Sequence, residues 1–375
     1  MRINIDGIQA FFIIIFLTTI TSIFLTGFNT IDSGASISRY FFYLLIVFVF
    51  CLHIIIGRVD FIFVVGCILV VGLKVLSVAE IISDTLMMVV IAWGISYVRY
   101  DLTKLHFNLI FTYGCLSILV AAFQVLGVEQ LHTWNTLMTN SQGEVDAGLS
   151  RFVISSPMSL VEQAQVRPPG LFHSSAIFSL FVCYFYALVL QKSIRFLPLG
   201  LFAIWICGSK IAFLFSFLYP LVMIYTRDDL PKLFLFKVIL TLIIFFLATF
   251  LLSPELAERR YSFESFIFSS ALRLRDVDDI LNLGIDFSIF SVLDGMDNLQ
   301  QREESRGGLS GIVQFTLLLA PLMIFGLKRL GHLFRKNNAE LMSALFVSLA
   351  TPITGNPFFV FLLYPIFSSF RTRKA

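Results

Sequence analysis

The stretch Ile8–Gly27 reads IQAFFIIIFLTTITSIFLTG and contains no charged residue. An apolar run of about 17 to 25 residues is long enough to cross the hydrocarbon core of a bilayer as a helix. This run is too long for the apolar region of a signal peptide, and it contains no small-x-small cleavage site. It therefore predicts a first transmembrane helix.

Similar apolar runs recur along the whole chain. The composition, 58% hydrophobic and 14% charged, is too apolar for burial in one globular core. We therefore predict an all-α, polytopic integral membrane protein with about twelve helices, formed as a single transmembrane domain over residues 1–375. The predicted spans are Ile8–Gly27, Ser38–Ile56, Phe61–Val78, Ile81–Val98, Leu105–Val128, Leu171–Leu190, Phe196–Cys207, Ile211–Tyr225, Leu233–Leu252, Leu309–Leu327, Leu341–Thr354 and Pro357–Phe370.

The region Phe196–Tyr225 is the least regular part of this pattern, because Gly208-Ser209-Lys210 interrupts it. The break indicates either two short helices or one long helix interrupted near mid-depth. Lys and Arg in short loops mark the cytoplasmic side of a membrane protein, and two crossings at the break bring the short-loop cations to one side. We therefore expect two helices, cytoplasmic termini and a bacterial inner-membrane location.

Two long polar segments, residues 129–170 and 253–308, then fall on the opposite, periplasmic face. Loops of this length between helices are uncommon unless they have a function. The second segment is densely charged. The predicted chemistry therefore lies on these two segments and on the helix ends beside them.

The first segment ends in a cationic, proline-stiffened elbow, Val166-Arg167-Pro168-Pro169-Gly170-Leu171-Phe172-His173. A guanidinium group stays charged and its fork matches phosphate oxygens, so Arg167, Arg273 and Arg275 are candidates for holding a diphosphate. The alternative is that each outer arginine pairs with an acidic residue of its own loop. Arg167 departs from that alternative, because two prolines and a glycine follow it and no carboxylate does.

Other candidates have weaker signals. Asp297 and Glu304 are candidate bases for a sugar hydroxyl, although acidic loop residues are usually only solvated. Lys210 at the helix break is a candidate ligand or a side chain that reaches the interface. His173 is an acid, a base or a residue at a helix start. The candidate catalytic residues are Arg167, Arg273, Arg275, Asp297 and Glu304, and the candidate substrate-binding residues are Lys210, Gly170, His173 and Arg302.

Three of these stretches resemble the bacterial O-antigen polymerases and the related O-antigen ligases. Arg167–His173 is similar to the family's Arg-x-x-Gly segment before a membrane helix, and Ser209-Lys210 resembles its Ser-Arg pair with Lys in place of Arg. Arg273–Gly284 has the Arg and Gly spacing that polymerases often show, and Gly307–Gly311 opens the next helix. The slot in which ligases carry a His-Asn pair reads Asp297-Asn298, which favours a polymerase.

The resemblance implies a glycosyltransferase that polymerises O-antigen or another surface polysaccharide. Its substrate would be an oligosaccharide linked to undecaprenyl diphosphate, in contact with membrane lipid, and a chain-length regulator and a flippase would be its partners. No nucleic acid, metal or cofactor is expected. The sequence lacks the P-loop and HExxH motifs, so nucleotide-driven transport and the common hydrolases have no support. The alternatives are an O-antigen ligase that transfers glycan to lipid A core, and a membrane transporter or flippase.

Overall fold

A computed structural model describes residues 5–26, 34–75, 80–98, 102–126, 138–139, 145–146, 168, 170–172, 175–226, 232–252, 339–343 and 358–371. These residues are helical apart from turns and one pair of two-residue strands, so the predicted all-α class is confirmed for them. Their contacts group the chain into two compact units. Unit 1 comprises Met1–Phe178 and Thr354–Ala375, and unit 2 comprises Ser179–Ile353.

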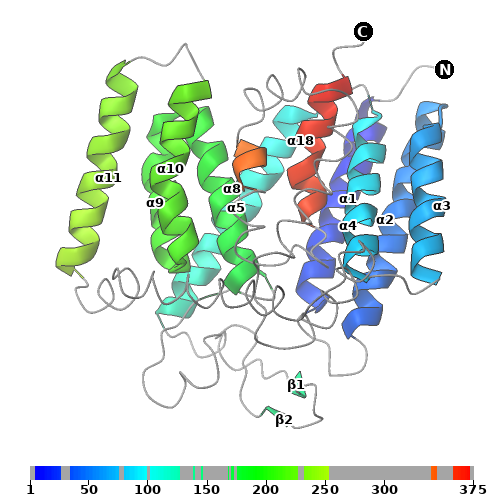
Figure 1. Ribbon diagram of the computed structural model, residues 1–375, viewed down its shortest axis with the longest axis horizontal. Helices are drawn as coiled ribbons and strands as arrows, with labels where there is room; N and C mark the ends of the chain where they lie inside the picture. The colour runs from blue at the N-terminus through cyan, green and yellow to red at the C-terminus, as the bar shows by residue number, and fades with distance from the viewer. Residues whose placement is uncertain are drawn as a thin grey trace, which may run out of the picture. The chain divides into compact units, whose positions relative to one another are not determined.

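Unit 1 contains the first five helices and the last one (Figure 1). Within it α1 packs against α2 and α5, and α4 packs against α2, α3 and α18. The C-terminal helix is therefore joined to the N-terminal ones. The bounds are α1 Ile5–Thr26, α2 Gly34–Ile56, α3 Phe61–Val75, α4 Glu80–Ser96, α5 Thr103–Val125, β1 Met138–Thr139, β2 Val145–Asp146 and α18 Phe359–Arg371.

Polar side chains join the helices of unit 1 at three buried points. The Asp60 carboxylate accepts hydrogen bonds from the Ile62 backbone N–H (3.1 Å), at the start of α3, and from Trp93 Nε1 (2.9 Å), on α4. His53 Nε2 lies 2.9 Å from the Gly94 carbonyl oxygen, and His106 Nε2 lies 2.9 Å from the Phe361 carbonyl oxygen. In apolar surroundings such bonds fix which helix faces which, because an unpaired polar group there is costly.

Unit 2 contains a helical hairpin at the predicted break. Gly208 ends α9 with a left-handed backbone (φ 58°), and α10 begins two residues later at Lys210. The two helices pack against each other (Figure 1), so the chain reverses at this point and does not continue as one long helix. The elements of this unit are α8 Ser175–Lys192 from Ser179 onward, η1 Ile194–Phe196, α9 Leu197–Cys207, α10 Lys210–Thr226, α11 Lys232–Leu252 and the helical residues 339–343.

The predicted spans correspond to the observed helices within a few residues wherever both are described. The largest shifts are at the starts of two helices. The helix α2 starts at Gly34 and not at the predicted Ser38. The helix α8 starts at Ser175 and not at the predicted Leu171, because Gly170–Phe172 form a turn before it. The predicted span Leu309–Leu327 lies outside the described residues. Among residues with described side chains, only Thr103–Val125 forms a helix long and apolar enough to cross a membrane, and the described parts of the other apolar helices are 10–17 residues long.

Candidate functional site

The elbow that ends the first long polar segment is anchored in unit 1. Pro168, Gly170 and Phe172 are all buried. Gly170 has a left-handed backbone (φ 58°), which residues with a Cβ rarely adopt. A Cβ at this position would meet the Ser117 carbonyl oxygen at 2.9 Å and the Phe178 ring at 3.1 Å. Both the backbone conformation and the available space therefore require glycine in the elbow.

A side-chain amide on α5 holds Gly170 from both sides. The Gly170 N–H donates to Gln124 Oε1 (3.0 Å), and Gln124 Nε2 donates to the Gly170 carbonyl oxygen (3.2 Å). Gln124 is fully buried. A primary amide carries a donor and an acceptor on one planar group, so it pairs with a backbone unit as a neighbouring β-strand would. The pair satisfies two buried backbone groups that no helix reaches.

The two residues after Gly170 extend this anchor. The Tyr113 hydroxyl, also on α5, donates to the Leu171 carbonyl oxygen (3.1 Å). The Phe172 ring is fully buried and has edge-to-face contacts with Tyr113 (5.4 Å between ring centroids) and Phe358 (6.0 Å). Rings at these distances are in the favourable range for aromatic pairs. The elbow is thus held by hydrogen bonds to α5 and by packing against the residue that precedes α18.

The residues of α5 that hold the elbow share one buried face. Tyr113, Ser117, Ala121 and Gln124 follow one another at spacings of three or four, the spacing of neighbours on a helix surface, and all are buried. Sequence reasoning missed Gln124 and Tyr113 as site residues. The signal was present, since polar side chains at helical spacing within an apolar helix indicate a face that meets another polar group.

The helix break carries Lys210 at the first position of α10. Before it, Ser209 receives a side-chain hydrogen bond from the Ala212 N–H (3.5 Å), and its carbonyl oxygen accepts from the Phe213 N–H (2.9 Å). Ser209 is therefore the N-cap of α10. The helix dipole does not favour a basic residue type at the first position of a helix, so helix stability does not explain the choice of lysine there.

Of the predicted site residues, the structure describes Gly170 completely and Lys210 by its backbone. The others lie outside the described residues: Arg167, His173, Arg273, Arg275, Asp297, Arg302 and Glu304. A shared diphosphate site for Arg167, Arg273 and Arg275 accordingly stays a prediction. What the structure adds is the anchored elbow, whose fixed backbone begins within three residues of Arg167.

Comparison with known proteins assigns no family to the chain. No protein-family model, no curated protein and no solved structure matches it.

Proposed function

We propose that this chain is a polytopic protein of the bacterial inner membrane and a polymerase of O-antigen or a related surface polysaccharide. The observation that carries the proposal is the anchored elbow. The Arg167–His173 stretch, on which the resemblance to O-antigen polymerases chiefly rests, has at its centre a glycine that α5 holds through both backbone groups. A rigid backbone three residues from a cation in the sequence suits the binding of a charged leaving group, because groups held in place before the reaction cost less to order during it.

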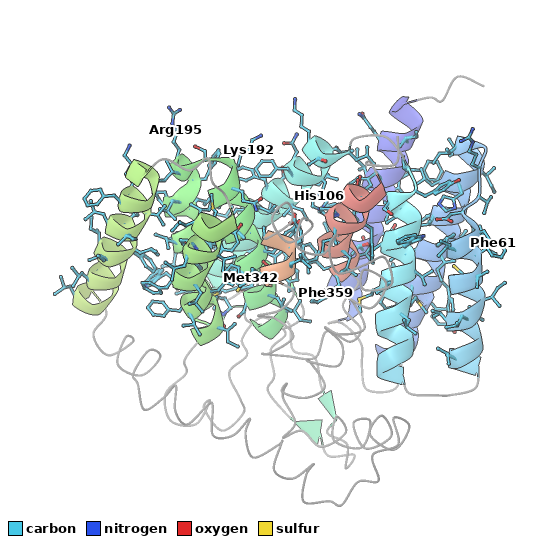
Figure 2. The ribbon with its side chains drawn as sticks, turned by 45° about the horizontal axis from the view of Figure 1, so that its top comes forward. Phe61, His106, Lys192, Arg195, Met342 and Phe359 are labelled. Atoms are coloured by element: carbon cyan, nitrogen blue, oxygen red, sulfur yellow. The ribbon has the colours of Figure 1, made fainter. Side chains whose placement is uncertain are left out.

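The membrane location is supported by the apolar side chains that the helices expose. On α3 of unit 1, Phe61 is 79% and Ile68 is 68% exposed, and on α11 of unit 2 Leu251 is 79% exposed. Figure 2 shows Phe61 directed away from its helix bundle. Contiguous apolar faces of this kind are rare on soluble monomers and are expected where lipid covers the protein. We propose about twelve transmembrane helices in all, with residues 129–170 and 253–308 in the periplasm.

The proposed orientation follows from charged side chains at helix ends. Lys192 and Arg195 are exposed at the junction of α8 and η1 (Figure 2). In unit 1, Arg58 and Lys104 are exposed just before α3 and at the start of α5. Short connections that carry Lys and Arg mark the cytoplasmic face. Both termini then lie in the cytoplasm.

The proposed reaction is glycosyl transfer between two lipid carriers. An acceptor sugar hydroxyl attacks the anomeric carbon of the growing glycan, a new glycosidic bond forms, and the bond from that carbon to the diphosphate oxygen breaks. Undecaprenyl diphosphate leaves with the bonding electrons, and Arg167, Arg273 and Arg275 are proposed to stabilise its charge. The hydroxyl proton passes to a carboxylate, for which Asp297 and Glu304 are the candidates.

The remaining residues are proposed to bind the substrate. Lys210 and Arg302 are proposed to bind phosphate or sugar oxygens, and Gly170 and His173 to shape the elbow beside them. Lys210 fits this role in one respect, because its place at a helix N-terminus is not explained by helix stability.

The deciding experiment compares two arginines in a host strain that lacks its own copy of the gene. Arg167→Ala is expected to reduce surface polysaccharide from a ladder of long chains to core plus a single repeat unit, as seen on a gel. The control is Arg195→Ala, an exposed cation at the proposed cytoplasmic face, which should leave the ladder unchanged. Protein levels are matched by immunoblotting.

The other outcomes distinguish the alternatives. A normal ladder from Arg167→Ala at a normal protein level would contradict the polymerase assignment of this residue. Loss of all attached glycan in the gene deletion would indicate a ligase. The same loss of attached glycan, with single lipid-linked repeat units held on the cytoplasmic side in place of polymerised chains on the periplasmic side, would indicate a flippase.

A further inference from the structure

One acidic side chain lies in the interior of unit 2. Glu340, within the helical residues 339–343, is 6% exposed. Its described neighbours along the chain, from Ala339 to Ser343, are buried as well. The sequence predicts a span that begins one residue later, at Leu341, which would leave Glu340 at the membrane edge. The structure instead places this carboxyl group among packed helices.

Two tyrosines from different helices accompany Glu340. Its carboxyl group lies close enough to the Tyr184 hydroxyl on α8 for the two to interact electrostatically, and Tyr184 interacts in turn with Tyr219 on α10. Both tyrosines are fully buried. Figure 2 labels Met342, which lies in the same helical turn as Glu340.

The position of Tyr184 along its helix gives the depth of the group. Tyr184 lies near the middle of α8, roughly 12 Å from either end at 1.5 Å per residue, and Tyr219 is similarly central in α10. Glu340 therefore meets α8 halfway along its length and away from both ends. An ionisable side chain at this depth of a membrane helix bundle is costly to keep, which makes it a candidate for function.

The described surroundings of Glu340 offer hydroxyl groups and no cation. The basic side chains that the structure describes in unit 2 are those of Lys192, Arg195 and Lys237, and all three are exposed. Ser343 lies one helical turn from Glu340 on the same face, and its hydroxyl is buried with no hydrogen-bond partner among the described residues. Ser343 is therefore a second polar group directed into the same interior.

An ionised carboxylate in this setting is unfavourable. A buried carboxylate with no counter-ion among the described residues is strongly destabilising, because it has lost its hydration and no described cation compensates for that loss. A protonated carboxyl group removes that cost, because it is neutral and offers one O–H donor and one carbonyl acceptor to nearby hydroxyl groups. The Tyr184 hydroxyl, which interacts with the Glu340 carboxyl group, can donate and accept, so it can pair with the neutral form as well as with the ionised form.

We propose that Glu340 is a proton-binding site, and that residues 339–343 stay packed in unit 2 only while the Glu340 carboxyl group holds its proton. The titratable groups that face the site from the described elements are the two phenols, Tyr184 and Tyr219. Loss of the proton requires water or a cation to enter the interior, or the 339–343 turn to leave it. The site is independent of the proposed polymerase chemistry.

The sign of the pH effect follows from proton linkage. When the protein unfolds at mildly acidic pH, Glu340 reaches water and releases its proton, whereas the folded protein retains it. Unfolding of the wild type therefore releases about one proton more than unfolding of Glu340→Gln, so a rise in pH destabilises the wild type more than the variant. The difference begins above the pKa of an exposed glutamate, about 4.3, and ends where the folded protein itself loses the proton.

The test uses the full-length protein in lipid nanodiscs. Thermal unfolding is followed as a function of pH for the wild type, Glu340→Gln, Tyr184→Phe and the control Tyr186→Phe. Tyr186 is fully buried on the same helix, but its hydroxyl donates to the Ser216 carbonyl oxygen (3.0 Å). We expect Glu340→Gln to flatten the pH dependence, and Tyr186→Phe to lower the unfolding temperature while keeping the wild-type pH dependence.

A spectroscopic measurement makes the test independent of whether Glu340→Gln folds. A protonated carboxyl group has an infrared C=O stretching band that a carboxylate lacks. We expect such a band in the wild type at mildly acidic pH, shifted by Tyr184→Phe and not by Tyr186→Phe. A band that Tyr184→Phe leaves in place, or an equal pH dependence of unfolding in the wild type and a folded Glu340→Gln, overturns the proposal.

Discussion

Gln124 and Gly170, 46 positions apart in the sequence, form a closed pair of hydrogen bonds in which each residue donates once and accepts once. The pair joins the apolar helix α5 to the end of a polar segment that the sequence alone describes only as a loop. It fixes the backbone of Gly170, three positions after Arg167 in the sequence. Mutations at either partner therefore test whether a rigid elbow is needed.

Gly170→Ala should damage both folding and function. The elbow would hold alanine in a left-handed backbone conformation, which costs about 1–3 kcal/mol of stability. The new Cβ would also lie too close to the Ser117 carbonyl oxygen. We expect a lower unfolding temperature and a shortened polysaccharide ladder. The matched control is Gly72→Ala in α3, where a Cβ meets nothing within 4 Å. If Gly170→Ala behaves like Gly72→Ala, the elbow is not held as described.

Gln124→Leu should destabilise unit 1 without changing the volume of the side chain greatly. It leaves the Gly170 N–H and carbonyl oxygen buried without partners, and each such group costs roughly 1–3 kcal/mol. Gln124→Glu keeps an acceptor for the N–H and loses the donor, so it should be partly defective. Thermal unfolding in detergent measures both. Asn108→Leu, an exposed change on the same helix, should leave the unfolding temperature unchanged.

The sequence predicts the helices well because each apolar run predicts a helix without reference to the rest of the chain. The runs at Ile8–Gly27 and Leu233–Leu252 coincide closely with α1 and α11. Partners are a different matter. Periodicity shows that Gln124 is a polar residue in an apolar helix, but it cannot predict that its partner is Gly170, 46 positions away. The burial of Glu340 was not predicted for the same reason. The apolar run that begins at Leu341 predicts a helix there, but it does not predict which other helix Glu340 packs against.

The contact between the His106 imidazole and α18 should stabilise unit 1. It lies 2.9 Å from the Phe361 carbonyl oxygen on α18 and packs against the rings of Phe12 and Tyr364. His106→Phe keeps an aromatic ring and removes the polar contact, so we expect a loss of about 1–3 kcal/mol of stability. Lys104→Ala, an exposed change on the same helix, is the control. Equal unfolding temperatures for the two variants would contradict a stabilising role for the contact.

The proposed topology makes a prediction about access from either side of the membrane. In a parent protein whose five native cysteines are replaced by alanine, Thr139→Cys and Arg195→Cys introduce single thiols. Thr139 belongs to the segment proposed to be periplasmic, and Arg195 is an exposed residue at the proposed cytoplasmic face. A membrane-impermeant maleimide added to cells with a permeabilised outer membrane should label Thr139→Cys alone. It should label Arg195→Cys only after the inner membrane is disrupted. Labelling of both thiols from outside would place the two residues on one face and remove the basis for a periplasmic site, because the parity of the helices between them would then be wrong.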